Sequence, residues 1–236
     1  MRFLIILICI LSMGPIMEAQ TGISTGGMGF RVFQKPGDVF QRFNEFGLTQ
    51  AEFNAIKNGM YPNPNYLPGS IYENGKEMVR DLPMRYNAYT DEIEVKEKRQ
   101  SEDYQTLEKN ENVSVKIAYD PYIYLPDNGI KEKSGFMNVL VDGEKYKLYK
   151  KETVTFHPLV KAQTGYDSDS PARFTQNVYY YLVQNGNLMD IPSRKSKVVD
   201  MLENENSGMK SYIKKSKLDV RKEADLKKAV EHLDTL

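Results

Sequence analysis

The spacing of apolar residues changes twice along the chain, and each change indicates a different kind of structure. From Asp38 to Asn58 apolar residues recur at helical spacing, and from Ser70 to Ile191 they alternate with polar ones. Helical spacing returns from Ser193 onward. This order predicts an α+β protein. We expect an antiparallel β-meander, shaped as a curved sheet, partial barrel or sandwich, with short N-terminal helices and a C-terminal cluster of about three.

The N-terminal part predicts two short helices followed by a loop. The first helix is indicated by four apolar residues, with Gly47 after them: Val39, Phe40, Phe43 and Phe46. Thr49 and Glu52 have the spacing of a capping box that opens the second helix. The segment from Tyr61 to Gly69 contains three prolines, which lack backbone donors, so we expect it to be a loop.

Three dipeptides in the alternating region predict β-hairpins. They are Asn74-Gly75, Asp142-Gly143 and Asn185-Gly186, and each lies between two alternating runs. Both residues of such a pair tolerate the positive φ that a type I′ turn requires. A further pair of alternating runs, 84–89 and 92–96, flanks Thr90-Asp91. We therefore expect residues 70–192 to form one antiparallel β domain.

The C-terminal segment, residues 193–236, predicts three short helices. Apolar residues cluster around Val198 and around Met209, and a third group lies on one face of the last stretch: Leu226, Ala229, Val230 and Leu233. Helices this short are marginally stable alone. We expect them to pack on the β domain.

The first residues predict export. Arg2 precedes an apolar run from Phe3 to Met13, which is typical of a signal peptide and too short for the roughly 20 residues of a membrane span. We expect residues 1–19 to be removed after Ala19 and residues 20–37 to be a flexible lead-in, ahead of the helices and Pro-rich loop of residues 38–69. Lipid attachment at Cys9 and an uncleaved anchor are the alternatives.

Composition narrows the compartment and the partners. Cys9 is the one cysteine, so the mature chain would have no disulfide, which favours a bacterial envelope over a eukaryotic secretory route. We expect the periplasm or the extracellular face of a Gram-negative envelope. The chain has 32 basic and 32 acidic residues without a long block of one sign, so we expect no nucleic-acid partner.

The chain also resembles a known group of proteins. The strings that carry the resemblance are Asn74-Gly75-Lys76, residues 82–95, Tyr179 to Val183 and Lys222 to Leu226. Over about Ser70 to Leu236 their order is similar to that of exported Bacteroidota envelope proteins of unassigned function. The resemblance implies an envelope location and no reaction.

Residues that could carry chemistry are few. His157 and His232 lack metal-ligand spacing, and no Gly-x-Ser-x-Gly motif is present. We therefore expect no catalytic residues and no cofactor. Asp167 and Asp169 are a weak candidate for Ca²⁺, which needs more oxygen ligands than these two supply, and a solvated turn is the favoured interpretation.

Tyrosines are the better candidates for binding. Two groups stand out: Tyr119, Tyr122 and Tyr124, and the run Tyr179, Tyr180 and Tyr181. A tyrosine ring with its hydroxyl suits recognition of a glycan, peptide or protein. The competing interpretation is core packing, because strands favour aromatic residues.

Three functions follow from these observations. The leading hypothesis is a non-enzymatic exported envelope protein that acts in protein–protein interaction or assembly, with another envelope protein as partner. An alternative is a binding module for a glycan or small apolar ligand, with a pocket of roughly 300 Å³ or more. A hydrolase of unfamiliar type would need converging carboxylates with separated pKa values.

Overall fold

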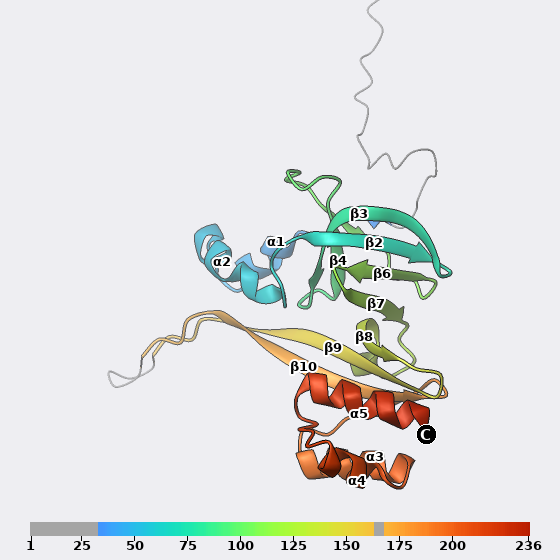
Figure 1. The fold of residues 1–236 in the computed structure, drawn as a ribbon. Coiled ribbons are helices and arrows are strands. Elements are labelled where there is room, and N and C mark those ends of the chain that lie inside the picture. The colour runs from blue at the N-terminus through green and yellow to red at the C-terminus, as the bar shows by residue number, and fades with distance from the viewer. Residues whose placement is uncertain (1–32, 163–167) are drawn as a thin grey trace, which may run out of the picture.

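A computed structural model describes residues 33–162 and 168–236 (Figure 1). The predicted signal peptide, most of the lead-in and Asp167 lie outside the described residues. The described part is rich in β-strand and also contains five α-helices. None of these helices is long and apolar enough to cross a membrane.

All strands of the described part belong to one antiparallel sheet that does not close on itself. They are β1 (Phe33–Gln34), β2 (Leu67–Glu73), β3 (Lys76–Asn87), β4 (Glu92–Val95), β5 (Gln105–Leu107), β6 (Val113–Ile117), β7 (Asp120–Leu125), β8 (Gly135–Asp142), β9 (Tyr146–His157), β10 (Arg173–Gln184) and β11 (Asn187–Asp190). The prediction of an antiparallel, sheet-rich fold is confirmed.

The strand order differs from that of a simple meander. It runs β1-β5-β4-β3-β2-β6-β7-β8-β9-β10-β11, so β2 lies between β3 and β6. The chain builds the sheet outward from β2 to β5, then returns to the other side of β2. Alternation identifies strands, but it does not say which strands pair when a loop rather than a tight turn connects them, as between β5 and β6.

Two of the three predicted turns have the expected backbone. Asn74 and Gly75 have φ of 49° and 77°, and Asn185 and Gly186 have φ of 50° and 78°. These values agree with type I′ turns between β2 and β3 and between β10 and β11.

The turn between β8 and β9 is held in a different way. Neither Asp142 nor Gly143 has a positive φ. Instead, the carboxylate of Asp234 accepts hydrogen bonds from the backbone N–H groups of Glu144, Lys145 and Tyr146 at 3.1, 2.7 and 2.7 Å. The hairpin is where the sequence predicts it, but a helical residue far along the chain fixes its turn.

The predicted Pro-rich loop is shorter than expected, because β2 already begins at Leu67. Pro68 lies opposite Pro83 of β3, and neither residue has an N–H to donate. Their carbonyls point away from each other: Pro68 accepts from Ala118 at 2.8 Å and Pro83 from Lys96 at 2.9 Å. Two prolines therefore fit the sheet as a pair that exchanges no hydrogen bonds.

The short strand β1 also departs from the expectation. It lies within residues 20–37, which were expected to be a flexible lead-in, and it pairs with β5 through Phe33 and Leu107. A two-residue strand has no periodicity that a sequence pattern could show.

The two N-terminal helices are confirmed. They are α1 (Val39–Asn44) and α2 (Gln50–Ile56), followed by the 3₁₀ helix η1 (Lys57–Met60), and Thr49 with Glu52 forms the predicted capping box. Phe43 is fully buried and packs edge-on against Phe156 of β9 and Phe174 of β10. These helices thus lie against the end of the long β9–β10 ribbon where β9 finishes and β10 begins (Figure 1).

The three C-terminal helices are confirmed as well. They are α3 (Lys195–Glu205), α4 (Met209–Lys215) and α5 (Glu223–Thr235). The predicted apolar face of α5 is buried in one cluster with Leu148 of β9 and Leu182 of β10. The helices therefore cover the opposite end of the ribbon from α1 and α2 (Figure 1).

The sheet bends so that the turn between β3 and β4 returns to β9. The N–H of Val154 in β9 donates to the carbonyl of Ala88 at 3.2 Å. Asp91, in that turn, accepts from Lys151 Nζ at 2.7 Å and from the Tyr86 hydroxyl at 2.7 Å. Gly135 faces the same carboxylate, and a Cβ there would overlap it. This cluster, in which Tyr86 and Lys151 are buried and Asp91 is partly exposed, joins strands that are not neighbours in the sheet.

Candidate functional site

The structure divides the six predicted binding tyrosines into buried and accessible ones. Tyr122 and Tyr181 are buried, Tyr124 and Tyr180 are half-buried, and Tyr119 and Tyr179 are exposed at 90% and 49%. Core packing is therefore the observed role of Tyr122 and Tyr181. Recognition stays a prediction for the exposed rings.

The strand that carries Tyr179 has one partly uncovered edge. β10 pairs with β9 along its whole length, but β11 pairs with it from Tyr181 to Gln184 only. The last bond on that side is from Ile191 N–H to the Tyr180 carbonyl, at 2.9 Å, and Pro192 follows. Within residues 33–162 and 168–236, no backbone group pairs with this edge from Arg173 to Tyr179.

Alternation fixes which residues face the uncovered edge. Because Tyr180 directs its backbone groups toward β11, every second residue before it points the same way. Phe174, Gln176 and Val178 therefore direct their N–H and C=O groups outward. We call Arg173 to Tyr179 the open edge of β10.

The open edge lacks several of the features that usually prevent strand pairing, although Arg173 at its start is charged and the Gln176 side chain donates to the Tyr61 carbonyl at 2.8 Å. It contains no proline and no lysine, and its register with β9 has no bulge. Val178 and Tyr179 are about half exposed on opposite faces. A cavity of about 380 Å³ lies where β11 ends, and its lining includes Val178, Tyr179, Tyr180, Ile191 and Leu226.

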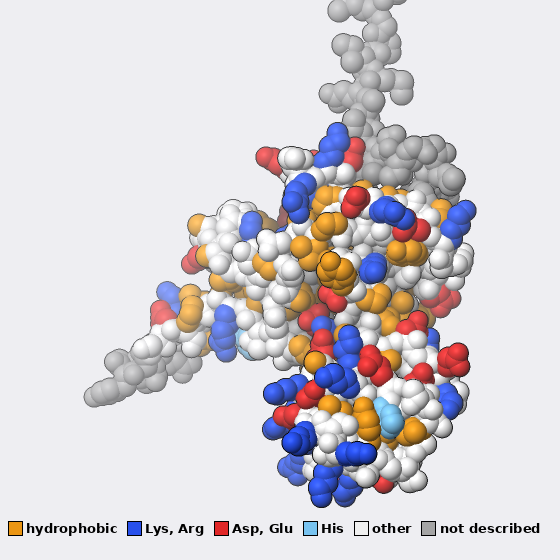
Figure 2. All heavy atoms as spheres, viewed as in Figure 1, with side chains coloured by type: hydrophobic (Ala, Val, Ile, Leu, Met, Phe, Trp, Pro, Cys, Tyr) orange, Lys and Arg blue, Asp and Glu red, His pale blue; other side chains and the backbone are white. Residues whose placement is uncertain are grey.

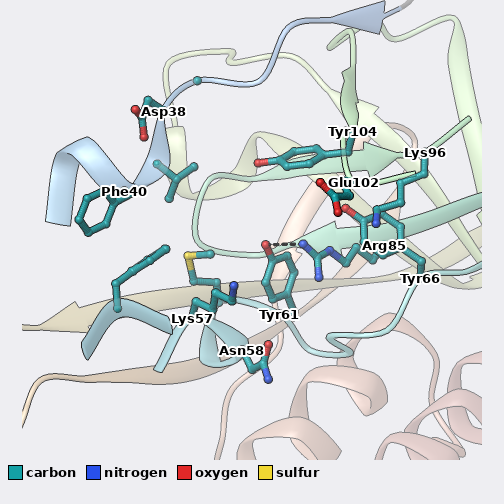
Figure 3. A pocket seen from close by; sticks show the side chains of 14 residues that line it. Asp38, Phe40, Lys57, Asn58, Tyr61, Tyr66, Arg85, Lys96, Glu102 and Tyr104 are labelled. Carbon is teal, nitrogen blue, oxygen red and sulfur yellow. Dashed lines mark hydrogen bonds between the residues drawn. The ribbon is translucent and has the colours of Figure 1, made fainter. Parts of the chain in front are cut away.

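A second candidate site is a cavity of about 430 Å³ between α1, η1 and the β3–β4 hairpin (Figure 3). Its aromatic lining comprises Phe40, Phe53, Tyr61, Tyr66 and Tyr104, and its charged lining comprises Asp38, Lys57, Arg85, Lys96 and Glu102. We call it the aromatic cavity. None of these tyrosines was among the predicted binding residues.

A buried carboxylate holds one wall of the aromatic cavity in place. The side chain of Glu94 is 1% exposed and accepts from four side chains. The donors are Arg85 Nε at 2.7 Å, the hydroxyls of Tyr61 and Tyr66 at 3.0 and 2.9 Å, and Asn87 Nδ2 at 2.9 Å. A buried charge is costly unless it is paired in this way.

Arg85 orients the two tyrosine rings. Its guanidinium carbon lies 3.8 Å from the centre of the Tyr61 ring and 4.3 Å from that of Tyr66, and its Nη1 donates to the Pro64 carbonyl at 2.9 Å. Burial, and then the charge of Glu94, raises the pKa of Tyr61 and of Tyr66 well above the usual value. Both rings are therefore neutral and fixed before any ligand binds.

Other polar groups of the aromatic cavity are free. Within the described ranges, no hydrogen-bond partner exists for the side chains of Lys57, Asn58, Glu102 and Tyr104. Burial, followed by the charge of Glu94, raises the pKa of Tyr104 to about 12, so its hydroxyl is a donor at neutral pH. Figure 3 shows the Tyr104 ring across the cavity from Lys57 and Asn58.

Three comparisons with known proteins found no match. No protein-family model matches the chain, and no curated protein or solved structure matches it. The open edge of β10 and the aromatic cavity therefore carry the functional argument.

The acidic and histidine candidates form no metal site in the described part of the chain. Asp167 lies outside that part, and Asp169 accepts a hydrogen bond from the N–H of Ala162 at 2.8 Å. His157 ends β9 opposite Arg173, and His232 stacks on Tyr212 with ring centres 3.6 Å apart.

One group of carboxylates could be compared with a hydrolase site. Burial raises the pKa of Glu152. Lys150 lies between Glu152, at 3.8 Å, and Glu223 of α5, at 3.3 Å. The arrangement is an ion-pair bridge between β9 and α5, and these distances give no support to the hydrolase hypothesis.

Proposed function

We propose that the protein is a non-enzymatic exported protein of a Gram-negative envelope that assembles by pairing the open edge of β10 with that of a second copy. The uncovered backbone of Phe174, Gln176 and Val178 carries this proposal. Addition of a strand to an exposed edge is a recurring mode of protein recognition. In this proposal the curved sheet is the scaffold, and the C-terminal helices stiffen the covered end of β10.

The open edge is self-complementary in an antiparallel arrangement. With Gln176 opposite its own copy across a two-fold axis, Phe174 lies opposite the partner's Val178. Each outward-facing pair then exchanges two backbone hydrogen bonds. The added strand stops where β11 ends, so it occupies the part of the edge that β11 leaves uncovered.

Charge also favours a second copy as the partner that pairs with the open edge. Arg173 is the one charged residue of the open edge, and the same register places it opposite the partner's Tyr179. A guanidinium and the face of an exposed aromatic ring attract each other. The chain has no formal net charge at pH 7, so two copies are not kept apart by long-range repulsion.

Sedimentation velocity over a range of concentrations tests the proposal, on protein expressed with its own leader and purified from the periplasm. We expect a dimer for the wild type and a monomer for Val178→Lys, because lysine on an edge strand opposes pairing. Tyr119→Lys, at an exposed position away from β10, is the matched control and stays dimeric. A wild type that is monomeric throughout, or a dimeric Val178→Lys, contradicts the proposal.

A further inference from the structure

We infer that the aromatic cavity is a binding site for an uncharged saccharide. The cavity shares no lining residue with the open edge of β10, and the two sites touch through one hydrogen bond, from Gln176 Nε2 to the Tyr61 carbonyl at 2.8 Å. The inference does not depend on the assembly proposal. Its volume, about 430 Å³, is within the range of small-molecule sites.

The aromatic walls suit the faces of a sugar ring. Five aromatic side chains line the cavity, and the C–H faces of a pyranose pack against such rings. The rings of Tyr61 and Tyr66 are held by Glu94 and Arg85, so binding does not have to order them. Walls that are fixed beforehand reduce the entropic cost of binding.

The free polar groups suit sugar hydroxyls. Tyr104 and Lys57 offer donors, Glu102 offers acceptors, and the amide of Asn58 offers both. A hydroxyl can donate and accept, so it can satisfy any of these groups. A purely apolar ligand would cover them without replacing their hydrogen bonds to water, which is unfavourable.

The balance of charge favours a ligand without charge. Lys57 and Lys96 face Asp38 and Glu102 around the cavity, and Arg85 is already paired with Glu94 at 2.7 Å. Lys96 is further engaged by the Ser101 carbonyl at 2.6 Å. No excess of one sign is therefore left in the cavity to select an acidic or a basic ligand (Figure 3). Over the upper part of the molecular face in Figure 2, basic and acidic side chains are likewise interspersed.

Isothermal titration calorimetry of the full processed protein tests the inference. The probes are glucose, galactose, N-acetylglucosamine, cellobiose and chitobiose, with glucuronic acid as the charged comparison. We expect one-to-one binding of at least one uncharged sugar, tighter than that of glucuronic acid. Tyr104→Ala should weaken that binding at least tenfold, and Tyr104→Phe, which removes only the hydroxyl, should weaken it less.

Tyr119→Ala is the control, since it removes an exposed tyrosine outside the cavity. We expect its affinity to equal that of the wild type. The inference is overturned if none of these sugars binds, if glucuronic acid binds more tightly than the uncharged sugars, or if Tyr104→Ala retains full affinity. Because the Val178→Lys monomer keeps the cavity, sugar binding by that variant separates this result from the assembly proposal.

Discussion

The two halves of β10 share one backbone and one alternating pattern, yet their surroundings are opposite. From Tyr181 to Gln184 the strand lies between β9 and β11, and Leu182 is fully buried under the C-terminal helices. From Arg173 to Tyr179 it has one neighbouring strand. Tyr181 is 2% exposed and Tyr179 is 49% exposed. The number of neighbouring strands and helices, rather than the residue type, decides whether a tyrosine here packs or is accessible.

The largest expected difference between the halves comes from removing an apolar side chain. Leu182→Ala should lower the free energy of unfolding by about 2–5 kcal/mol, because it leaves a cavity in the core. Val178→Ala should change it by less than about 0.5 kcal/mol, as is usual at exposed sites. Urea denaturation at low protein concentration measures both. Equal losses would mean that Val178 is covered in solution.

Proline substitutions test which residues from Arg173 to Tyr179 direct their N–H toward β9 and which direct it outward. Thr175 directs its N–H toward Thr155 of β9, so Thr175→Pro should cost about 1–3 kcal/mol through the unpaired carbonyl. Val178 directs its N–H outward, so Val178→Pro should keep the fold and lose the dimer. Thermal unfolding and light scattering measure the two effects. If Val178→Pro is as unstable as Thr175→Pro, the Val178 N–H does not face outward as we have assigned it.

Removal of a hydroxyl should affect stability differently at Tyr181 and at Tyr179. The Tyr181 hydroxyl donates to the Glu132 carbonyl at 3.1 Å, so Tyr181→Phe should cost about 1 kcal/mol. Tyr179→Phe should leave the monomer's stability unchanged, because that ring is half exposed. Chemical denaturation of both variants provides the test. A larger loss for Tyr179→Phe would be inconsistent with the structure.

The smallest expected effect is the loss of stability that ionisation of Tyr181 causes at alkaline pH. Burial, and then the charge of Asp190, raises the pKa of Tyr181 to about 12. The neutral hydroxyl therefore contributes stability that is fully present below the unfolded value of 10.0 and is lost as the pH rises toward 12. Tyr181→Phe should lose less stability than the wild type between pH 9 and 11. Parallel loss in both proteins would contradict the raised pKa.

Local patterns predicted the elements of this fold well. The capping box at Thr49, the Asn-Gly turns and the apolar face of α5 depend on residues a few positions apart, and each is present in the structure. The interactions that bend the sheet were not predictable in this way. Asp91 and Lys151 are 60 residues apart, and no local pattern relates them.

The aromatic cavity could have been predicted in part. Arg85 and Glu94 are cross-strand partners in a hairpin whose two strands were recognised across Thr90-Asp91. Opposite charges at paired positions of alternating strands indicate an ion pair. Tyr61 and Tyr66, however, lie in the Pro-rich loop, where no periodicity shows that their rings turn toward Arg85.

Hydrogen exchange of individual backbone amides in β10 tests the assembly proposal most directly. The N–H groups of Phe174, Gln176 and Val178 should exchange fast in dilute protein and become protected as the concentration rises, because a second copy then covers them. The N–H groups of Thr175 and Asn177, which face β9, should be protected at every concentration. Fast exchange of Gln176 and Val178 at all concentrations would contradict pairing through the open edge.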